Sequence, residues 1–244
     1  MVEALLAGSW GFVGGASLLV GALIGLYASV SQGVIALVMA AGAGVLISLV
    51  AFELMEEAYK QGGFDSPAIG LLLGAVAYFA ADWAVSRRAK HRKRSGDQQE
   101  GGSGTAIAVG ALMDGIPESS AIGISLIGGG SVSWVFVVAV FLSNVPEGLS
   151  AAAGMKKAGR SAAHILGLWA AVVVASALAA LFGYPFLAGA SGETVAVIQS
   201  FAAGAILTML ASTMMPEAYQ EGGAAVGVVT TVGFLVAFVL SHLE

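Results

Sequence analysis

Residues Gly44–Gly63 read GVLISLVAFELMEEAYKQGG, and residues Gly204–Gly223 read GAILTMLASTMMPEAYQEGG. Both stretches contain Glu-Ala-Tyr near their end and both finish on two glycines. Apolar composition alone gives shared Ala, Gly and Leu, but it does not give a shared Glu-Ala-Tyr. We therefore interpret the two stretches as copies of one structural unit, each long and apolar enough to form most of a membrane-spanning helix.

The composition of the whole chain is that of a membrane protein. It is 58% hydrophobic and 10% charged, with a mean hydropathy of +0.90, whereas a soluble domain is about 45–50% apolar and about 25% charged. Cysteine is absent, which excludes disulfides, thiolate metal sites and catalytic thiols. The first apolar stretch is too long for a cleavable signal and lacks a basic start, so we expect it to remain as a membrane helix.

Breaks at glycine, proline and charged residues predict eight transmembrane helices. One span needs about 20 apolar residues, so the 244 residues hold about eight spans in a single transmembrane domain, 1–244, of the all-α class. The predicted helices cover residues 5–29, 34–59, 66–86, 104–127, 132–155, 162–187, 193–219 and 223–241.

The positions of the basic residues predict the orientation of these helices, because Lys and Arg collect on the cytoplasmic side. All ten except Lys60 lie within Arg87–Arg94, after the third predicted helix, or within Lys156–Arg160, after the fifth. Both clusters then face the cytoplasm, which places both termini outside the cell membrane. The first cluster is predicted to begin a flexible cytoplasmic basic loop, 87–103. Because orientation explains this cluster, we expect no nucleic-acid binding.

The repeat predicts an inverted arrangement. Its copies lie in the second and seventh predicted helices, five crossings apart, so they cross the membrane in opposite directions. A shorter echo, Ile116-Pro117-Glu118 and Val145-Pro146-Glu147, lies in the adjacent fourth and fifth helices. Both echoes fit a 3+2+3 inverted-repeat architecture with helices 4 and 5 on the symmetry axis. Transporters built in this way bind their substrate near the midplane, on interrupted helices.

Five oxygen-bearing side chains on helices 4 and 5 form the candidate metal site: Asp114, Glu118, Ser143, Asn144 and Glu147. The spacing of three or four residues places the members of each helix on one face. A carboxylate in hydrocarbon is costly unless it is neutralised, paired or metal-bound. No Lys or Arg lies within a predicted span to pair with these acids, so a cation or protons must balance them.

Prolines strengthen this prediction. Pro117 and Pro146 cannot donate a backbone hydrogen bond and displace the carbonyls of Met113 and Leu142, which we expect to become polar groups beside the carboxylates. Pro216 has the same effect in the seventh helix.

Four further acids are candidates for the ion pathway. Glu53 lies in the middle of the second helix, and Glu57 near its outer end belongs either to an entrance funnel for cations or to a solvated helix end. Asp82 either serves the exit path or pairs with Arg87, and pairing is favoured. Glu217 lies towards the cytoplasmic end of the seventh helix, on the expected exit path.

These motifs resemble the ZIP family of divalent metal transporters, most closely its prokaryotic GufA-like branch. The resemblance covers nearly the whole chain, and it implies transport of zinc, iron or manganese through a carboxylate-rich midplane site on helices 4 and 5. It also implies Glu118 and Glu147 as central ligands, flanked by Asp114, Ser143 and Asn144. The metal is then a substrate rather than a prosthetic group. Import towards the cytoplasm and a homodimer are further implications.

The chain departs from the family pattern at several positions. The family's fourth-helix motif usually begins His-Asn, where this chain has Asp114-Gly115. The seventh helix often carries His-Glu, where this chain has Ser212 and Thr213, and the acid that some relatives have in the sixth helix is absent. With no histidine in the predicted core, the ligand set suits harder ions such as Mn²⁺ or Fe²⁺, while zinc stays open.

Two alternatives belong to other classes of protein. A ZIP-like metal sensor or scaffold that has lost transport is compatible with the altered motifs. An intramembrane protease using Asp82 and Asp114 is disfavoured, because the two acids lie at different predicted depths and no membrane histidine could activate a serine. We therefore predict a transporter and not an enzyme.

Overall fold

The computed structural model describes residues 2–94, 134–187 and 189–242, and within these ranges the chain is helical and contains no strand. The predicted all-α class is confirmed for this part of the chain. Seven of the eight predicted helices match a described helical stretch, and the predicted helix 104–127 lies outside the described residues.

Two helical units and one linking helix account for the described residues. The first unit contains α1 (Val2–Tyr27), α2 (Gln32–Leu49), the π-helix η1 (Val50–Met55), α3 (Glu56–Gly62) and α4 (Asp65–Arg94). The second contains α7 (Ala162–Leu187), α8 (Gly192–Met209), the π-helix η3 (Leu210–Met214), α9 (Met215–Gly222) and α10 (Ala225–Ser241). Between them in the sequence lies α6 (Trp134–Lys157).

Six described helices are long and apolar enough to cross a membrane. These candidate spans are Val2–Tyr27, Gln32–Gly62, Asp65–Ala84, Val137–Lys157, Ala162–Pro185 and Gly192–Gly222. A shorter apolar helix, α10, has 17 residues. The described part of the chain therefore has the helices of a multi-pass membrane protein.

The prediction of a loop from residue 87 is wrong for its first part, because α4 continues to Arg94. The segment 87–94 contains no glycine or proline, and its Arg, Lys and Ala residues are good helix formers. The guanidinium of Arg87 also lies 4.1 Å from the centre of the Trp83 ring on the preceding turn. Residues 95–103 of the predicted loop lie outside the described residues.

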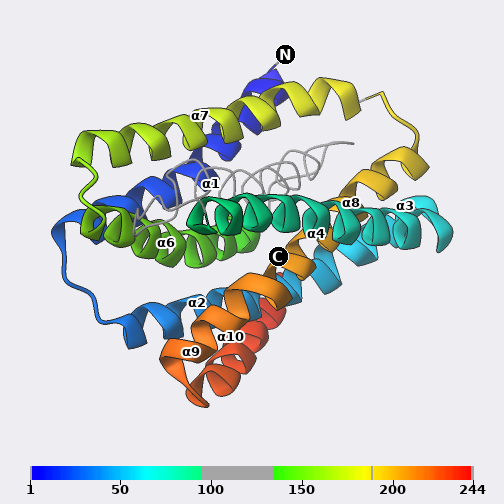
Figure 1. Ribbon diagram of the computed structural model, residues 1–244. Helices are drawn as coiled ribbons and strands as arrows, with labels where there is room; N and C mark the ends of the chain where they lie inside the picture. The colour runs from blue at the N-terminus through cyan, green and yellow to red at the C-terminus, as the bar shows by residue number, and fades with distance from the viewer. Residues whose placement is uncertain (1, 95–133, 188, 243–244) are drawn as a thin grey trace.

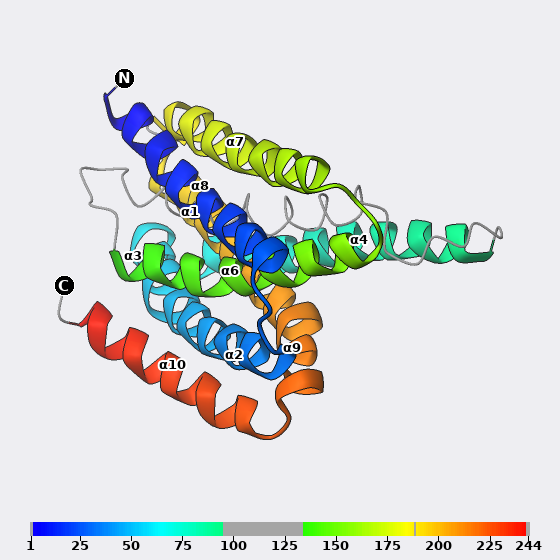
Figure 2. The same ribbon diagram turned by 90° about the vertical axis from the view of Figure 1, so that its left-hand side faces the viewer.

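Helix α6 lies between α1 and α2 (Figures 1 and 2) and packs against both. On one side, α1, α6 and α7 share a buried apolar cluster that includes Leu18, Ile165 and Trp169. On the other side, a larger cluster joins α2, η1, α8, η3 and α10 with the side of α6 that carries Val140. Helix α6, which carries the Pro146-Glu147 motif, therefore lies at the junction of the two apolar clusters.

Close glycine contacts hold α6 in place. A Cβ on Gly21 of α1 would lie 2.1 Å from the Val145 carbonyl oxygen, and one on Gly148 of α6 would lie 2.2 Å from the Leu18 carbonyl oxygen. Such distances leave no room for a side chain, so the two backbones touch directly, as small residues allow in membrane helices. The register between α1 and α6 is therefore fixed by glycine.

Polar contacts tie both ends of α1 to neighbouring helices. The Lys156 ammonium of α6 donates to the Leu26 carbonyl in the last turn of α1, and the Tyr184 hydroxyl of α7 donates to the Glu3 carboxylate. A cation at a helix C-terminus is also favoured by the helix dipole. Lys156, which the sequence marks as an orientation signal, therefore also caps α1.

The two units match element by element. Helices α1 and α7 begin at residues 2 and 162, α2 and α8 at 32 and 192, and α4 and α10 at 65 and 225. Ser31 and Ser191 cap α2 and α8 by accepting from backbone N–H groups at 3.4 and 3.3 Å.

Matched glycines end the repeated segments. Gly63 and Gly223 follow α3 and α9 with φ of 67° and 61°, a region that suits glycine. The last helix of each unit then packs on the other unit, α4 on α8 and α10 on α2.

Candidate functional site

The described part of the predicted metal site lies on α6. Ser143 is 3% and Asn144 2% exposed, and Glu147 is half-buried. Asp114 and Glu118, the predicted ligands from helix 4, lie outside the described residues. Buried polar groups must be hydrogen-bonded or otherwise compensated, so the partners of these three side chains define what the site offers to a ligand.

Asn144 is oriented by α1. Its side-chain Nδ2 donates to the Gly14 carbonyl oxygen at 3.5 Å, a contact between buried groups. The Ser17 hydroxyl, one turn along α1, donates to the same carbonyl. Because a carbonyl only accepts, the atom that faces Gly14 must be the amide nitrogen. The amide oxygen, the atom that a cation would bind, is therefore on the other side of the group.

Ser143 is oriented by its own helix. Its hydroxyl donates to the Val140 carbonyl at 3.0 Å, which leaves oxygen lone pairs for other groups. Glu53, Ser143 and Glu147 all have interaction partners in the structure, so none of them is an unpaired buried group.

The carbonyl displaced by Pro146 faces a neighbouring helix. Pro146 lies inside α6, and a Cβ on Gly42 of α2 would lie 2.7 Å from the Leu142 carbonyl oxygen. The Cα–H of a glycine is a weak donor that suits such a contact. Helix α2 therefore packs against this carbonyl, and its place beside the carboxylates stays a prediction.

A contact that the sequence reasoning missed links α6 to the second repeat copy. Ser150 of α6 lies beside the Glu217 carboxylate of α9. Ser143, Glu147 and Ser150 lie on one face of α6 by helical spacing, so the predicted ligand face is the one that meets Glu217. The spacing of three residues between Glu147 and Ser150 was the available signal.

Both repeat copies contain a π-helix where the sequence predicted a continuous α-helix. Glu53 lies in η1, and Ser212 and Thr213 lie in η3. The Ser212 hydroxyl donates to the Thr208 carbonyl at 2.8 Å. Short π-helical turns occur frequently at functional sites. Only the second copy gave a sequence signal, Pro216, because a proline removes one helical hydrogen bond.

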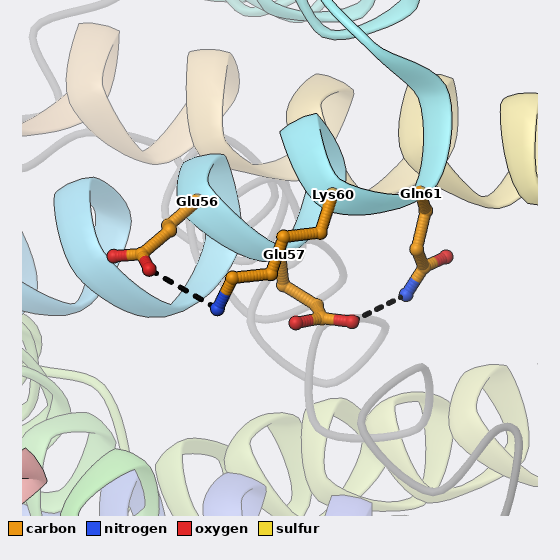
Figure 3. A network of polar contacts seen from close by, with 4 residues as sticks. All are labelled: Glu56, Glu57, Lys60 and Gln61. Atoms are coloured by element: carbon orange, nitrogen blue, oxygen red, sulfur yellow. Dashed lines mark hydrogen bonds and ion pairs between the residues drawn. The ribbon is translucent and has the colours of Figure 1, made fainter.

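Four polar side chains pair within α3 at the end of the first copy (Figure 3). Lys60 Nζ lies 3.1 Å from Glu56 Oε1, and Gln61 Nε2 donates to Glu57 Oε1 at 3.0 Å. All four residues are exposed. The charge of Glu56 is thus balanced on its own helix, an arrangement typical of a solvated helix end, and the pathway role of Glu57 stays a prediction.

Asp82 does not form the predicted ion pair with Arg87. It is half-buried on α4, and the Arg87 guanidinium stacks on Trp83 instead. Among the described residues the one ion pair is Lys60–Glu56. The helical continuation of α4 explains the difference, because it fixes Arg87 one turn beyond Trp83.

The described residues do not complete a metal site by themselves. Across residues 2–94, 134–187 and 189–242, no three His, Asp or Glu side chains lie together as metal ligands. The α6 set offers one carboxylate, one amide oxygen and one hydroxyl, and the other two predicted carboxylates belong to residues that are not described.

Comparisons with protein-family models and with curated proteins found no relative of this chain. The resemblance to the ZIP family therefore rests on the motifs of the chain itself.

Proposed function

We propose that this protein transports divalent metal cations across a cell membrane, through a site formed by Glu118 and Glu147 with Asp114, Ser143 and Asn144. The observation that carries the proposal is the polar face of α6. There, buried Ser143 and Asn144 and half-buried Glu147 lie at the junction of two apolar cores. A carboxylate, an amide and a hydroxyl gathered on one face of a buried helix offer the oxygen ligands that divalent cations accept.

The orientation of Asn144 supports cation binding rather than anion binding. Its donor group is used by the Gly14 carbonyl, and the Ser143 hydroxyl hydrogen by Val140. Both side chains therefore present acceptor oxygens. Carboxylate, amide and hydroxyl oxygens suit Mn²⁺ and Fe²⁺ well, and they also bind Zn²⁺. The metal in this proposal is cargo, and no prosthetic group or enzymatic step is required.

The proposed architecture has eight spans in a 3+2+3 inverted repeat, with both termini outside the cell. Its support is the agreement between the two units, whose helices begin 160 residues apart, as Val2 and Ala162 or Gln32 and Gly192 do. The reciprocal packing of α4 on α8 and α10 on α2 is what a two-fold relation would produce. The predicted span 104–127 would be the partner of α6 on the axis. The proposal includes a homodimer, as in the ZIP family.

The proposed mechanism is alternating access along a route through Glu53, Glu217 and Asp82. Glu53 and the Ser212–Thr213 pair lie in π-helices, where one extra residue per turn changes helical register and allows local rearrangement. Ser150 lies beside Glu217, so the ligand face of α6 adjoins the second copy. A cation leaving Glu147 would meet this contact next.

Uptake into proteoliposomes tests the proposal. Glu118→Gln and Glu147→Gln should each lower Mn²⁺ and Zn²⁺ uptake by about tenfold or more, the scale of losing a group in a metal site. Glu193→Gln changes an exposed acid in the first turn of α8 and is the matched control, expected to transport like the parent protein. Normal uptake by both site variants would refute the site.

A binding measurement separates the transporter from the sensor alternative. If the purified protein is stabilised by Mn²⁺ or Zn²⁺ and the stabilisation is lost in Glu147→Gln, but no uptake occurs at any metal gradient, then the chain binds metal without transporting it. If uptake follows the gradient and stops in Glu147→Gln, the sensor alternative is excluded.

A further inference from the structure

Gln199 is a buried amide on α8 whose side-chain oxygen has no partner. The residue is 5% exposed, and its Oε1 makes no hydrogen bond in the structure that is described. The adjacent Ser200 is fully buried but satisfied, since its hydroxyl donates to the Ala196 carbonyl at 2.6 Å. Native proteins leave few buried acceptors unpaired because each one is costly. Among the four buried side-chain atoms without a partner in the described residues, Gln199 Oε1 is the one that can only accept, so it is the one suited to a cation.

Helix α8 meets the end of α3 one turn before Gln199. A Cβ on Gly192, at the start of α8, would lie 3.0 Å from the Gln61 carbonyl oxygen, and one on Gly62 would lie 2.6 Å from the Ala196 Cβ. Gln199 follows Ala196 by three residues, about 5 Å along the helix and on the same side. It thus lies about one turn further along α8 than the contact with Gly62 of α3, the helix that carries the exposed network of Figure 3.

The same side of α8 continues towards η1. Helix α8 packs against both α3 and η1, and Glu53 precedes Gly62 by nine residues, which is about 13 Å along the helix. In depth, Gln199 therefore falls between the polar end of α3 and Glu53. A cation that moved from the polar end of α3 towards Glu53 and the α6 face would pass the depth at which Gln199 lies.

The other repeat copy shows that packing does not require an amide here. Met39 occupies the matching position of α2, 160 residues before Gln199, as Ser31 matches Ser191, and it is 4% exposed. Met39 belongs to the large apolar core. The same fold position is thus filled by an apolar side chain of similar length in one copy and by an unpaired amide in the other.

We propose that Gln199 is a cation contact on the transport route, where its amide oxygen replaces one water of the hydration shell of a divalent ion. This inference rests on the proposed function and extends it by a specificity-determining residue on α8. A neutral oxygen is suited to the role, because hard divalent cations accept amide oxygens. It also binds more weakly than a carboxylate, so that the ion can leave again.

The variant Gln199→Met, which copies the residue of the first repeat copy, tests the proposal through two readouts. Without metal, its melting temperature should equal or exceed that of the parent protein, since an unpaired buried oxygen is removed. In proteoliposomes, its half-saturating Mn²⁺ concentration should rise by about threefold or more, the scale of one lost neutral polar contact. Ser200→Ala is the control and should leave half-saturation unchanged.

Several outcomes would overturn the inference. A stable Gln199→Met protein with unchanged half-saturation would show that the oxygen contacts no ion, and a melting temperature far below the parent would show a structural role. Gln199→Glu, which keeps the shape, offers a second test. This variant should lower both the half-saturating Mn²⁺ concentration and the maximal rate of uptake. No change in either quantity would also refute the contact.

Failure of this inference is distinguishable from failure of the proposed function. If the parent protein takes up no divalent metal, the transport proposal itself falls. The rise in melting temperature on adding Mn²⁺ then tests whether Gln199 contacts the ion. A smaller rise in Gln199→Met than in the parent supports the contact, and equal rises refute it.

Discussion

The two copies of the repeat have the same local structure, but their polar side chains have different partners. In each, a serine-capped helix leads through a π-helix to a short helix that ends at a glycine. In the first copy, the acids of the short helix pair with Lys60 and Gln61 on the same helix. In the second copy, Glu217 reaches Ser150 on α6. Shared residues therefore shape the fold, and the residues that differ decide which polar side chains each copy brings near the candidate site.

The largest expected effect tests the shared part of the comparison. A Cβ on Gly44 would lie 1.9 Å from the Thr230 carbonyl oxygen, and one on Gly204 would lie 2.0 Å from the Leu71 carbonyl oxygen. Gly44→Ala and Gly204→Ala should each lower the free energy of unfolding by about 3 kcal/mol, because helices must separate. Thermal melting in detergent measures this.

Gly167→Ala is the control for these variants. No atom lies within 4 Å of a Cβ at Gly167, so this change should be neutral or slightly stabilising, as is usual for Gly→Ala in a helix. Equal melting temperatures for all three variants would show that the two matched contacts are not close. A large loss for one copy only would break the equivalence of the copies.

An intermediate effect tests the difference between the copies. Ser150→Ala removes the hydroxyl beside Glu217, and it should lower the free energy of unfolding by about 1 kcal/mol, because the carboxylate loses one polar neighbour. Gln61→Ala removes the corresponding partner of Glu57 on an exposed helix end and should leave the melting temperature unchanged within error. The same loss in both variants would mean that Glu217 is no better anchored than Glu57.

The smallest effect concerns the cause of the π-helices. Because η1 forms without a proline, Pro216 is not required for η3, and Pro216→Ala should retain it. The expected loss is about 0.5 kcal/mol, through the greater freedom of the unfolded chain. A structure of the variant together with its melting temperature checks this. Conversion of η3 to a regular α-helix would show that the two copies reach the same shape for different reasons.

Much of the fold was predictable because it depends on local pattern. The repeated Glu-Ala-Tyr and Gly-Gly motifs located both copies, and apolar length gave the helices that are described. The loop predicted from residue 87 was wrong, since a basic composition was interpreted as a loop although it lacks any helix breaker before Arg94. The π-helices were missed because a change in backbone register leaves no consistent residue signature.

The candidate site was predictable only as a set of residue types. Pattern and spacing selected Ser143, Asn144 and Glu147 on α6, and the structure places them on a helix enclosed by two cores. Their partners were not predictable. Asn144 pairs with the Gly14 carbonyl 130 residues away, and the Leu142 carbonyl faces Gly42 of α2.

The sequence by itself determined the all-helical membrane class, the repeat and the polar face of α6, because hydropathy, periodicity and motif identity are properties of the chain. Tertiary structure alone decided how these parts are used. It determined that α1 orients Asn144, that Ser150 lies beside Glu217, and that Gln199 is buried without a partner where Met39 is packed. The physical reason is that hydrogen bonding and burial depend on which helices touch, and that choice is made by glycine contacts between residues far apart in the chain.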